Sequence, residues 1–445
     1  MTAAAVALAT GLLLIPALWN GFPLLQWDTG GYLARWYEGT LVVSRSTVYG
    51  GLLYVLQAPS FWPVILLQAA LATWTIGLVL RGFGLARPLA ILITIAALTA
   101  VTTLPWLTSI LLTDIFAGLA VLAAYLLTFS WGRLAPLERG GLMALMAVAT
   151  ATHSATLLLV IGLAAVGLLY ALLRPARLAP RRLAPAAATC AAGAVLLVSC
   201  NYAVSGRVAW TPGGASILCA RMLEDGIVHR YLEEQCATRA FRLCQFRHQL
   251  PRSSDEFLWG GGPNSIFNRL GRFTGLGPEM QVIALESLVL YPALQIESAL
   301  SATARQLVTV GSGEGVVSHL PHTTGIIERF TPAWATAMRT ARQQAEGVAL
   351  LPWLNRVHVP VALGSVLALL VLGLRALHRG RLDALDILAL TVVLAFVLNA
   401  VICGVFANPH PRYGARVAWL APFVLMILAM RSLPRLRPDG PVTRT

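Results

Sequence analysis

Charged side chains beside long apolar segments are the first residues of this sequence that could carry chemistry. Asp28 follows the first apolar segment, within Trp27-Asp28-Thr29-Gly30-Gly31-Tyr32. A carboxylate beside hydrocarbon costs free energy, so its presence there indicates a function. Partial desolvation raises the pKa of a carboxylate, which suits proton abstraction from a hydroxyl. Asp28 is therefore a candidate general base or metal ligand. An equally weighted alternative is the N-cap of a short helix that starts near Tyr32.

A second carboxylate, Asp114, lies at the outer end of a later apolar segment, in Thr113-Asp114-Ile115. A charge so close to lipid usually faces a cavity or a partner. The alternative is again an N-cap, because an anion is favoured where a helix begins. The unbroken run of apolar and hydroxyl residues before Asp114 favours the cavity, so Asp114 is a second catalytic candidate.

Two arginines near the ends of apolar segments are candidates for binding phosphate. Arg45 lies in Ser44-Arg45-Ser46, and Arg412 lies in Pro411-Arg412-Tyr413. The planar guanidinium of Arg pairs with phosphate through two hydrogen bonds. Arg412 could instead be an interface residue that extends its charge to water. Tyr413 and the prolines beside Arg412 make a stiff aromatic loop, which favours the binding interpretation.

Histidines and cysteines give weaker signals. His153 and His322 are candidate substrate-site residues that could bind metal or carry protons, and the alternative is an ordinary histidine in an ordered loop. Cys236 and Cys244 lie eight residues apart in a polar region, and Cys219 lies nearby. We expect one structural disulfide, with Cys236–Cys244 the favoured pair, although sequence does not settle the pairing of three cysteines.

The elements that position these residues are apolar helices. The chain has 445 residues, of which 57% are hydrophobic and 12% are charged, against about 25% charged in soluble domains. A span needs about 20 apolar residues. Ten segments qualify as candidate spans, at residues 3–20, 61–80, 88–106, 111–130, 141–153, 155–173, 185–204, 357–377, 384–406 and 415–430. The segments between Arg139 and Arg174 are interpreted as a hairpin that turns at His153.

The distribution of charge orients these spans. All 33 basic residues are Arg, and the formal net charge is +14. One side of the ten-span arrangement carries 15 Arg and four acids, and the other carries 18 Arg and 15 acids. The more positive side is expected to be cytoplasmic, with both termini there. No basic arm with interleaved aromatic residues is present, so nucleic acid is excluded as a partner.

Three parts follow from this arrangement. Residues 1–204 hold seven spans and the first outward loop at 21–60. Residues 205–355 form a mostly helical outward domain. Within it, 216–247 is expected to be helical, and 279–310 is an amphipathic helical stretch interrupted at Pro292. Residues 356–445 hold the last three spans and a cytoplasmic tail.

The pattern resembles the GT-C superfamily of integral-membrane glycosyltransferases. The resemblance rests on Asp28 in the first outward loop, the Arg45-to-Tyr49 stretch before the second span, Asp114, and Arg412-Tyr413 between the last two spans. Members with a similar pattern of residues include the aminoarabinose and galacturonic-acid transferases of lipid A and the protein mannosyltransferases. By position, Asp28 and Asp114 correspond to the catalytic acids, and Arg412 to the contact with the donor phosphate. Tyr49 joins the candidate substrate-site residues on the same basis.

The resemblance implies an all-α polytopic enzyme of a bacterial inner membrane. It would transfer a sugar from a polyprenyl-phosphate donor to a lipid or cell-envelope glycan on the outward face, among membrane lipids. The sequence requires no cofactor. A divalent metal is possible, although the first loop has one Asp where metal-using members have paired acids. The alternatives are a transporter or flippase of lipid-linked saccharides, and an envelope polysaccharide polymerase or acyltransferase. Clustering of the charges at one face counts against transport.

Overall fold

The fold is helical throughout the part of the chain that the structure describes. This computed structural model describes residues 2–175, 177–260 and 262–432, so the tail at 433–445 lies outside the described residues. Within these ranges the only bridge between extended segments joins Leu24 to Ile110. The prediction of an all-α chain is confirmed.

Six helical segments are long and apolar enough to cross a membrane. They are α5 (Trp62–Gly82), α10 (Ser154–Leu173), α11 (Ala184–Ser205) with the turn before it, α22 (Leu351–His378), α23 (Ala384–Phe406), and α24 (Pro411–Ala418) continued by α25 (Leu420–Ser432). Three shorter apolar helices accompany them: α1 (Ala3–Leu13), α6 (Pro88–Val101) and α8 (Ile115–Phe129). The chain is therefore a multi-span helical membrane protein. The count of ten crossings stays a prediction, because four of the ten predicted spans, at residues 3–20, 88–106, 111–130 and 141–153, are not among these six.

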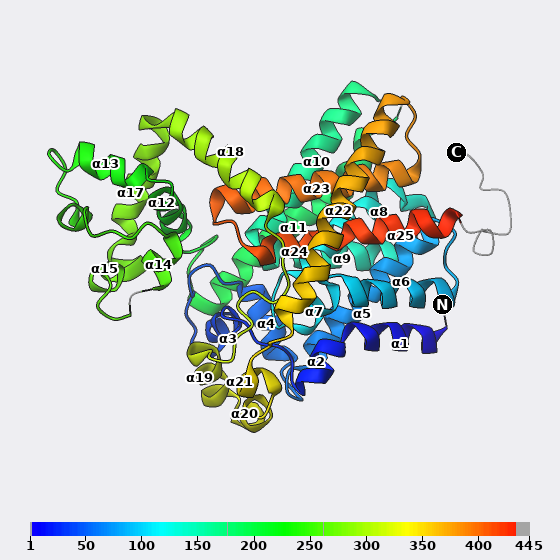
Figure 1. Cartoon of the computed structure of the whole chain (residues 1–445), viewed down its shortest axis with the longest axis horizontal. Coiled ribbons are helices and arrows are strands. Elements are labelled where there is room, and N and C mark those ends of the chain that lie inside the picture. The colour runs from blue at the N-terminus through cyan, green and yellow to red at the C-terminus, as the bar shows by residue number, and fades with distance from the viewer. Residues whose placement is uncertain (1, 176, 261, 433–445) are drawn as a thin grey trace.

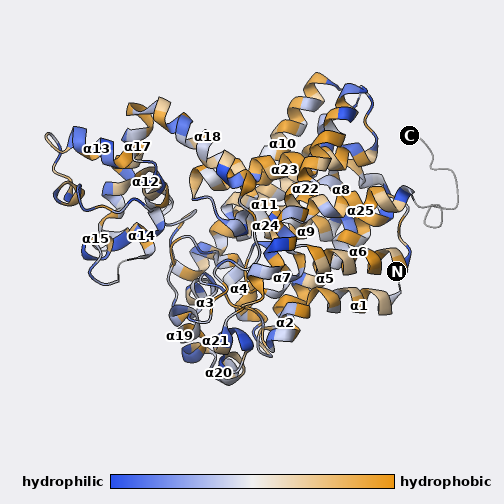
Figure 2. Cartoon of the chain, in the orientation of Figure 1, coloured by the Kyte–Doolittle hydropathy of each residue, from blue (hydrophilic) through white to orange (hydrophobic). Residues whose placement is uncertain are grey.

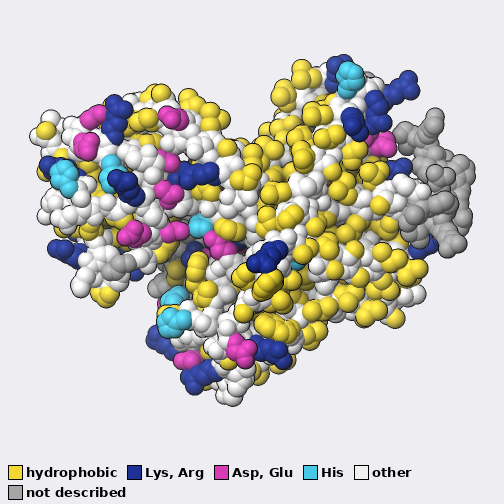
Figure 3. Space-filling view, viewed as in Figure 1, with side chains coloured by type: hydrophobic (Ala, Val, Ile, Leu, Met, Phe, Trp, Pro, Cys, Tyr) yellow, Lys and Arg dark blue, Asp and Glu magenta, His cyan; other side chains and the backbone are white. Residues whose placement is uncertain are grey.

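The surface of the helical bundle is suited to lipid. Only 28% of the most apolar window of α10, and the same share of α22, is buried inside the molecule. Their outward side chains are largely leucine and valine, so they need an apolar solvent. Figures 2 and 3 show this apolar surface over much of the right-hand part of the molecule, with charged side chains over the left-hand part and a further group of them at the upper right. In Figure 1, α1 begins and α25 ends at the right-hand end of the bundle.

Three further helices complete the bundle: α2 (Ile15–Asn20), α7 (Leu104–Ser109) and α9 (Pro136–Thr152). α9 ends at Thr152 and α10 begins at Ser154, so the helix is interrupted at His153, where the sequence predicts a turn. Both helices pack against α11. The imidazole of His153 caps the new helix, because its Nδ1 accepts a hydrogen bond from the N–H of Ala155 at 3.1 Å.

A separate lobe stands beside the bundle, at the left of Figure 1. It comprises α12 (Gly214–Glu224), α13 (Ile227–Gln235), α14 (Ser254–Trp259), α15 (Ile266–Arg269), α16 (Arg272–Gly275) and α17 (Gly277–Leu290). Its own core contains Tyr231, Phe267 and Ile283, among other side chains. The stretch 216–247 is helical in parts, with a break at Gly226, whose φ of +79° is easy only for glycine.

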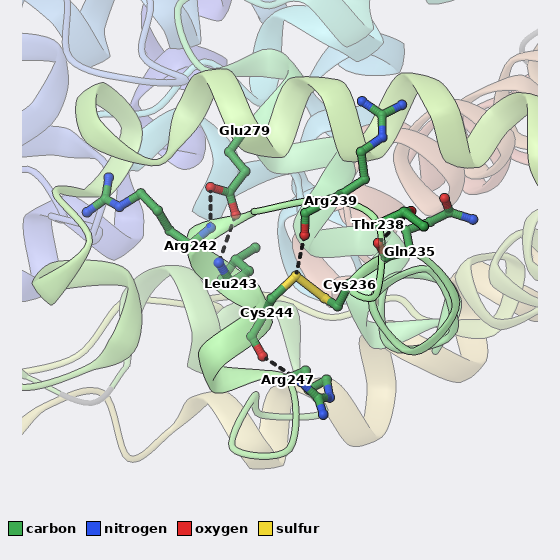
Figure 4. The surroundings of a disulfide bond; sticks show 9 residues. All are labelled: Gln235, Cys236, Thr238, Arg239, Arg242, Leu243, Cys244, Arg247 and Glu279. Carbon is green, nitrogen blue, oxygen red and sulfur yellow. Dashed lines mark hydrogen bonds between the residues drawn. A yellow bond between two sulfur atoms is a disulfide. The ribbon is translucent and has the colours of Figure 1, made fainter.

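A disulfide closes one loop of this lobe. Cys236 and Cys244 are bonded, with their Cα atoms 5.6 Å apart, as predicted, and Cys219 is free and buried. The carboxylate of Glu279 on α17 accepts hydrogen bonds from the backbone N–H groups of Arg242 and Leu243, at 2.8 and 2.9 Å (Figure 4). The closed loop is therefore attached to α17.

Beyond the lobe, the chain returns to the bundle. It bends by 101° between α17 and α18 (Pro292–Val308), at the predicted break, and α18 packs against α23. Then α19 (Pro321–Phe330) packs against α3 (Thr29–Tyr37), which is followed by α4 (Thr47–Val55). α19 is followed by α20 (Pro332–Arg339) and α21 (Arg342–Glu346), and α21 packs against α2. Ile327 and Met338 belong to the main core and not to the core of the lobe. The stretch 205–355 therefore consists of two packing units.

Candidate functional site

An extended segment places the first outward loop beside the start of α8. The N–H of Leu24 donates to the carbonyl of Ser109 at 2.9 Å, and the N–H of Leu111 donates to the carbonyl of Leu24 at 2.9 Å. The hydroxyl of Thr29 donates to the carbonyl of Leu111 at 3.0 Å. These bonds hold Asp28, on one segment, near Asp114, on the other.

Asp28 stands at the N-cap position of α3, but its side chain makes no capping hydrogen bond. Its carboxylate instead lies between two arginines that are distant in sequence. One oxygen pairs with Arg45, and the other accepts a hydrogen bond from Nη1 of Arg412 at 2.9 Å. Asp28 is only 7% exposed. The side chain is therefore committed to a charge cluster, although the backbone does start a helix.

The two arginines reverse the pKa expected for Asp28. Burial alone would raise this pKa, as expected for a carboxylate beside lipid. The charges of Arg45 and Arg412, with the hydrogen bond from Arg412, instead hold the pKa below its ordinary value of 3.8. The expectation of a raised pKa is wrong, because the sequence does not show that both guanidinium groups contact this carboxylate. In the observed arrangement Asp28 is ionised at neutral pH.

The loop that carries Arg412 is held by Glu314. One carboxylate oxygen of Glu314 lies 2.6 Å from Nδ1 of His410, and the other accepts a hydrogen bond from the backbone N–H of Arg412 at 3.0 Å. Nε2 of His410 also lies 3.6 Å from Oδ2 of Asp255 in the lobe. Burial alone would lower the pKa of His410, but the hydrogen bond and charge of Glu314, with the charge of Asp255, raise it above 6.5.

Sequence reasoning missed Glu314. Its signal was a single acid in the glycine-rich loop Gly311-Ser312-Gly313-Glu314-Gly315. Gly315 has a φ of +75°, and a Cβ there would lie 2.3 Å from Nε2 of Gln26. Glycine at this position therefore lets the Glu314 loop approach the Asp28 loop closely.

Asp114 also stands at an N-cap position without a capping bond. It is 3% exposed, and its Oδ2 has no hydrogen-bond partner among the described residues. The charges of Arg412 and Arg416 act on it, as does the charge of Asp28. The structure thus brings Asp114 into the electrostatic surroundings of Asp28, although Arg412 pairs with Asp28 and Arg416 with Asn399 instead.

Arg416, one turn beyond Arg412 on α24, is a second residue that sequence reasoning missed. It is fully buried, and its Nε donates to Oδ1 of Asn399 at 2.7 Å. Its Nη1 finds no partner within the described ranges. The available signal was an arginine inside an apolar segment, four residues after Arg412, which places both on one side of a helix.

Two other predicted site residues lie close to the cluster. The hydroxyl of Tyr413 accepts a hydrogen bond from Nη2 of Arg412 at 3.3 Å. His153 lies within electrostatic range of Asp28. Because Nδ1 of His153 accepts from Ala155, a neutral ring carries its proton on Nε2 and can donate from there.

The remaining two predicted residues are placed differently. Tyr49 is fully buried, and its hydroxyl donates to Oε1 of Gln68 at 2.8 Å. Its ring packs edge-on against Tyr32 on α3, so it supports the Asp28 loop from the core. His322 is exposed on α19 and lies over Gly30, where a Cβ would come within 3.0 Å of its Nδ1.

The cluster combines an ionised carboxylate, two guanidinium groups, a phenol and an imidazole at one end of the bundle. Such a set can bind an anion through the arginines and accept a proton at the carboxylate. In the part of the chain that the structure describes, no three His, Cys, Asp or Glu side chains are grouped so that they could hold a metal ion. Comparisons with family models, with curated proteins and with solved structures find no match to this chain.

Proposed function

We propose that the chain is a membrane glycosyltransferase of GT-C type, which transfers a sugar from a polyprenyl-phosphate donor to a hydroxyl of a lipid or envelope glycan. We place it in a bacterial inner membrane with ten crossings, both termini in the cytoplasm, and the Asp28 cluster on the outward face. The excess of Arg at the opposite ends of the spans supports this orientation.

One observation carries the proposal: Asp28 is shared by Arg45 and Arg412, and all three lie at one end of a lipid-facing bundle. A glycosyl transfer from a lipid phosphate needs a base for the acceptor hydroxyl and cations for the departing phosphate. Here both kinds of group are in contact, although Asp28 and Arg412 are 384 positions apart in the chain. The apolar surface of the spans is a suitable contact for a polyprenyl chain beside this cluster.

The chemistry follows from competition for the arginines. A donor phosphate draws Arg412 and Arg45 away from Asp28, so the carboxylate loses its ion pairs and its pKa rises. The acceptor hydroxyl then gives its proton to Asp28, and its oxygen bonds to the anomeric carbon. The bond from that carbon to the phosphate oxygen breaks. The polyprenyl phosphate leaves with the bonding electrons, and the guanidinium groups stabilise its added negative charge.

The test is release of polyprenyl phosphate by the purified protein in lipid nanodiscs, with a panel of polyprenyl-phosphate sugars. Wild type should release it from at least one donor when an acceptor is present. Arg412→Ala should lower this rate by about 10²-fold or more, because a pre-placed charge on the leaving group is lost. Arg329→Ala is the matched control, since Arg329 is an exposed residue of α19 whose Nη1 makes a long ion pair, 3.8 Å from Oε1 of Glu38.

Transport of lipid-linked saccharides is the alternative that this experiment separates. The 101° bend between α17 and α18 is a feature that broken transporter helices share. Movement of a fluorescent donor across a vesicle bilayer, with no release of polyprenyl phosphate from any donor, would replace the transferase proposal by transport.

A further inference from the structure

The helix α17 is apolar on two opposite sides, and the lobe uses only one of them. Met280, Ile283 and Ala284 are buried in the core of the lobe. The opposite side of α17 and the start of α18 leave large apolar side chains between 43% and 79% exposed. We call these the elbow patch: Leu285, Leu288, Val289, Leu290, Ile296 and Leu300.

The charges of α17 do not face this patch. Glu279 accepts hydrogen bonds from the Arg242–Leu243 backbone, and Glu286 binds the hydroxyl of Tyr231 and the guanidinium of Arg239. Both carboxylates are therefore occupied within the lobe. An apolar side of a helix is stable only where it meets an apolar environment. Water is not an apolar environment for the elbow patch. A contiguous exposed apolar surface of this kind marks a contact site.

The position of the patch identifies the contact. α18 packs tightly on the membrane-crossing helix α23, since a Cβ at Gly404 would lie 2.8 Å from the carbonyl oxygen of Ala302. The elbow patch is therefore continuous with the lipid-facing surface of the bundle, at the end that carries the Asp28 cluster. Figure 3 shows apolar side chains along the upper edge of the lobe and onward over the bundle.

We infer that the elbow between α17 and α18 lies in the bilayer leaflet on the side of the Asp28 cluster, with the elbow patch among the acyl chains. Glu297 flanks the patch and is exposed. A carboxylate there limits immersion to the headgroup and upper acyl region, about 5–10 Å deep, as for interfacial helices. The inference does not depend on the proposed function.

This contact has a structural consequence for the site. Gln306, near the end of α18, is buried and makes two hydrogen bonds with the backbone of His410. Its Oε1 accepts from the N–H at 2.9 Å, and its Nε2 donates to the carbonyl at 3.0 Å. The helix that rests in the leaflet thereby holds the loop that carries Arg412.

The experiment measures immersion directly. A nitroxide is attached at Val289→Cys, and separately at Leu300→Cys, in the full chain with its four free cysteines replaced by Ala, in nanodiscs. The matched control is Glu233→Cys, on an exposed side of α13 in the same lobe. Collision rates are measured with oxygen, which concentrates in lipid, and with a water-soluble nickel chelate.

Both patch labels should collide at least about fivefold more often with oxygen, relative to the chelate, than the control label does, because the bilayer excludes the chelate. Equal ratios at all three positions would overturn the inference. Dipolar broadening that disappears when labelled protein is diluted with unlabelled protein would also overturn it, because a second copy of the chain would then cover the patch.

Discussion

Asp28 is the side chain on which the site is centred, and its two ion pairs define its chemistry. A carboxylate between two guanidinium groups is a weak base, because both cations favour its ionised form. It becomes a stronger base only when another anion takes the cations. If that anion is a donor phosphate, proton abstraction is coupled to donor binding. Without donor, Asp28 stays paired with both arginines and is too weak a base to deprotonate other hydroxyls.

The pair of His410 and Glu314 gives a prediction about pH. The pKa of His410 is raised above 6.5 in the folded protein, so its contribution to stability is complete below pH 6.5 and is lost as pH rises through the raised pKa. The pKa of Glu314 is lowered below 4.5, so Glu314 stays ionised throughout this range. Thermal unfolding in nanodiscs should show wild type losing about 1–2 kcal/mol of stability between pH 6 and 9.

The variant His410→Gln should lack this loss, because it has no proton to release. His378→Gln removes an exposed histidine at the far end of α22 and serves as the control, which should keep the wild-type slope. If the stability of His410→Gln fell with pH as steeply as that of wild type, the loss would not come from deprotonation of His410.

At the scale of elements, the sequence signals that succeeded were local. Pro292 has no backbone N–H to continue α17 and instead begins α18, and the polar residues around His153 separate two apolar runs, so both breaks could be predicted. The Cys236–Cys244 disulfide also needed only a short spacing in a polar region.

The contacts that form the site are long-range, and that is why the sequence did not show them. Leu24 pairs with residues 109–111, and Gln306 holds His410 across 104 positions. The types of these residues do not predict which distant residues they contact. Tyr49 illustrates the same limit, because a tyrosine near the site in sequence can support it from the core.

Close packing between α3 and α19 gives a prediction at this scale. A Cβ at Gly30 would lie 2.6 Å from Cα of Thr323, and the N–H of Gly30 donates to the hydroxyl of Thr323 at 3.0 Å. Gly30→Ala should therefore push α19 away from α3 and cost about 1–3 kcal/mol of unfolding free energy.

The control for this substitution lies in α19 itself. A Cβ at Gly325 meets no atom within 4 Å, so Gly325→Ala should be neutral or should stabilise by about 0.5–1 kcal/mol through helix propensity. Reversible unfolding of both variants in mixed micelles compares them. Equal stability of the two would contradict the packing described between α3 and α19.

At the scale of the whole molecule, the lobe and the α19–α21 unit both stand at the end of the bundle that carries Asp28 (Figure 1). The proposed orientation puts this end outside the cell. The prediction is tested with a membrane-impermeant thiol reagent on intact cells, in the chain without its four free cysteines.

Glu233→Cys, in the lobe, should react without permeabilisation, because α13 lies on the outward side. Leu137→Cys, at the exposed start of α9, should react only after the membrane is opened. The opposite pattern would invert the topology and move the Asp28 cluster to the cytoplasm.

The most direct test of the central claim is the rate of sugar transfer by Asp28→Asn in nanodiscs, with Glu233→Gln as the control for loss of an exposed carboxylate. We predict that kcat falls by about 10²–10⁴-fold, because the acceptor hydroxyl loses its base. KM for the donor should not rise, since Arg45 and Arg412 are released to bind phosphate, and Glu233→Gln should match wild type. Transfer by Asp28→Asn at the wild-type rate would contradict the account.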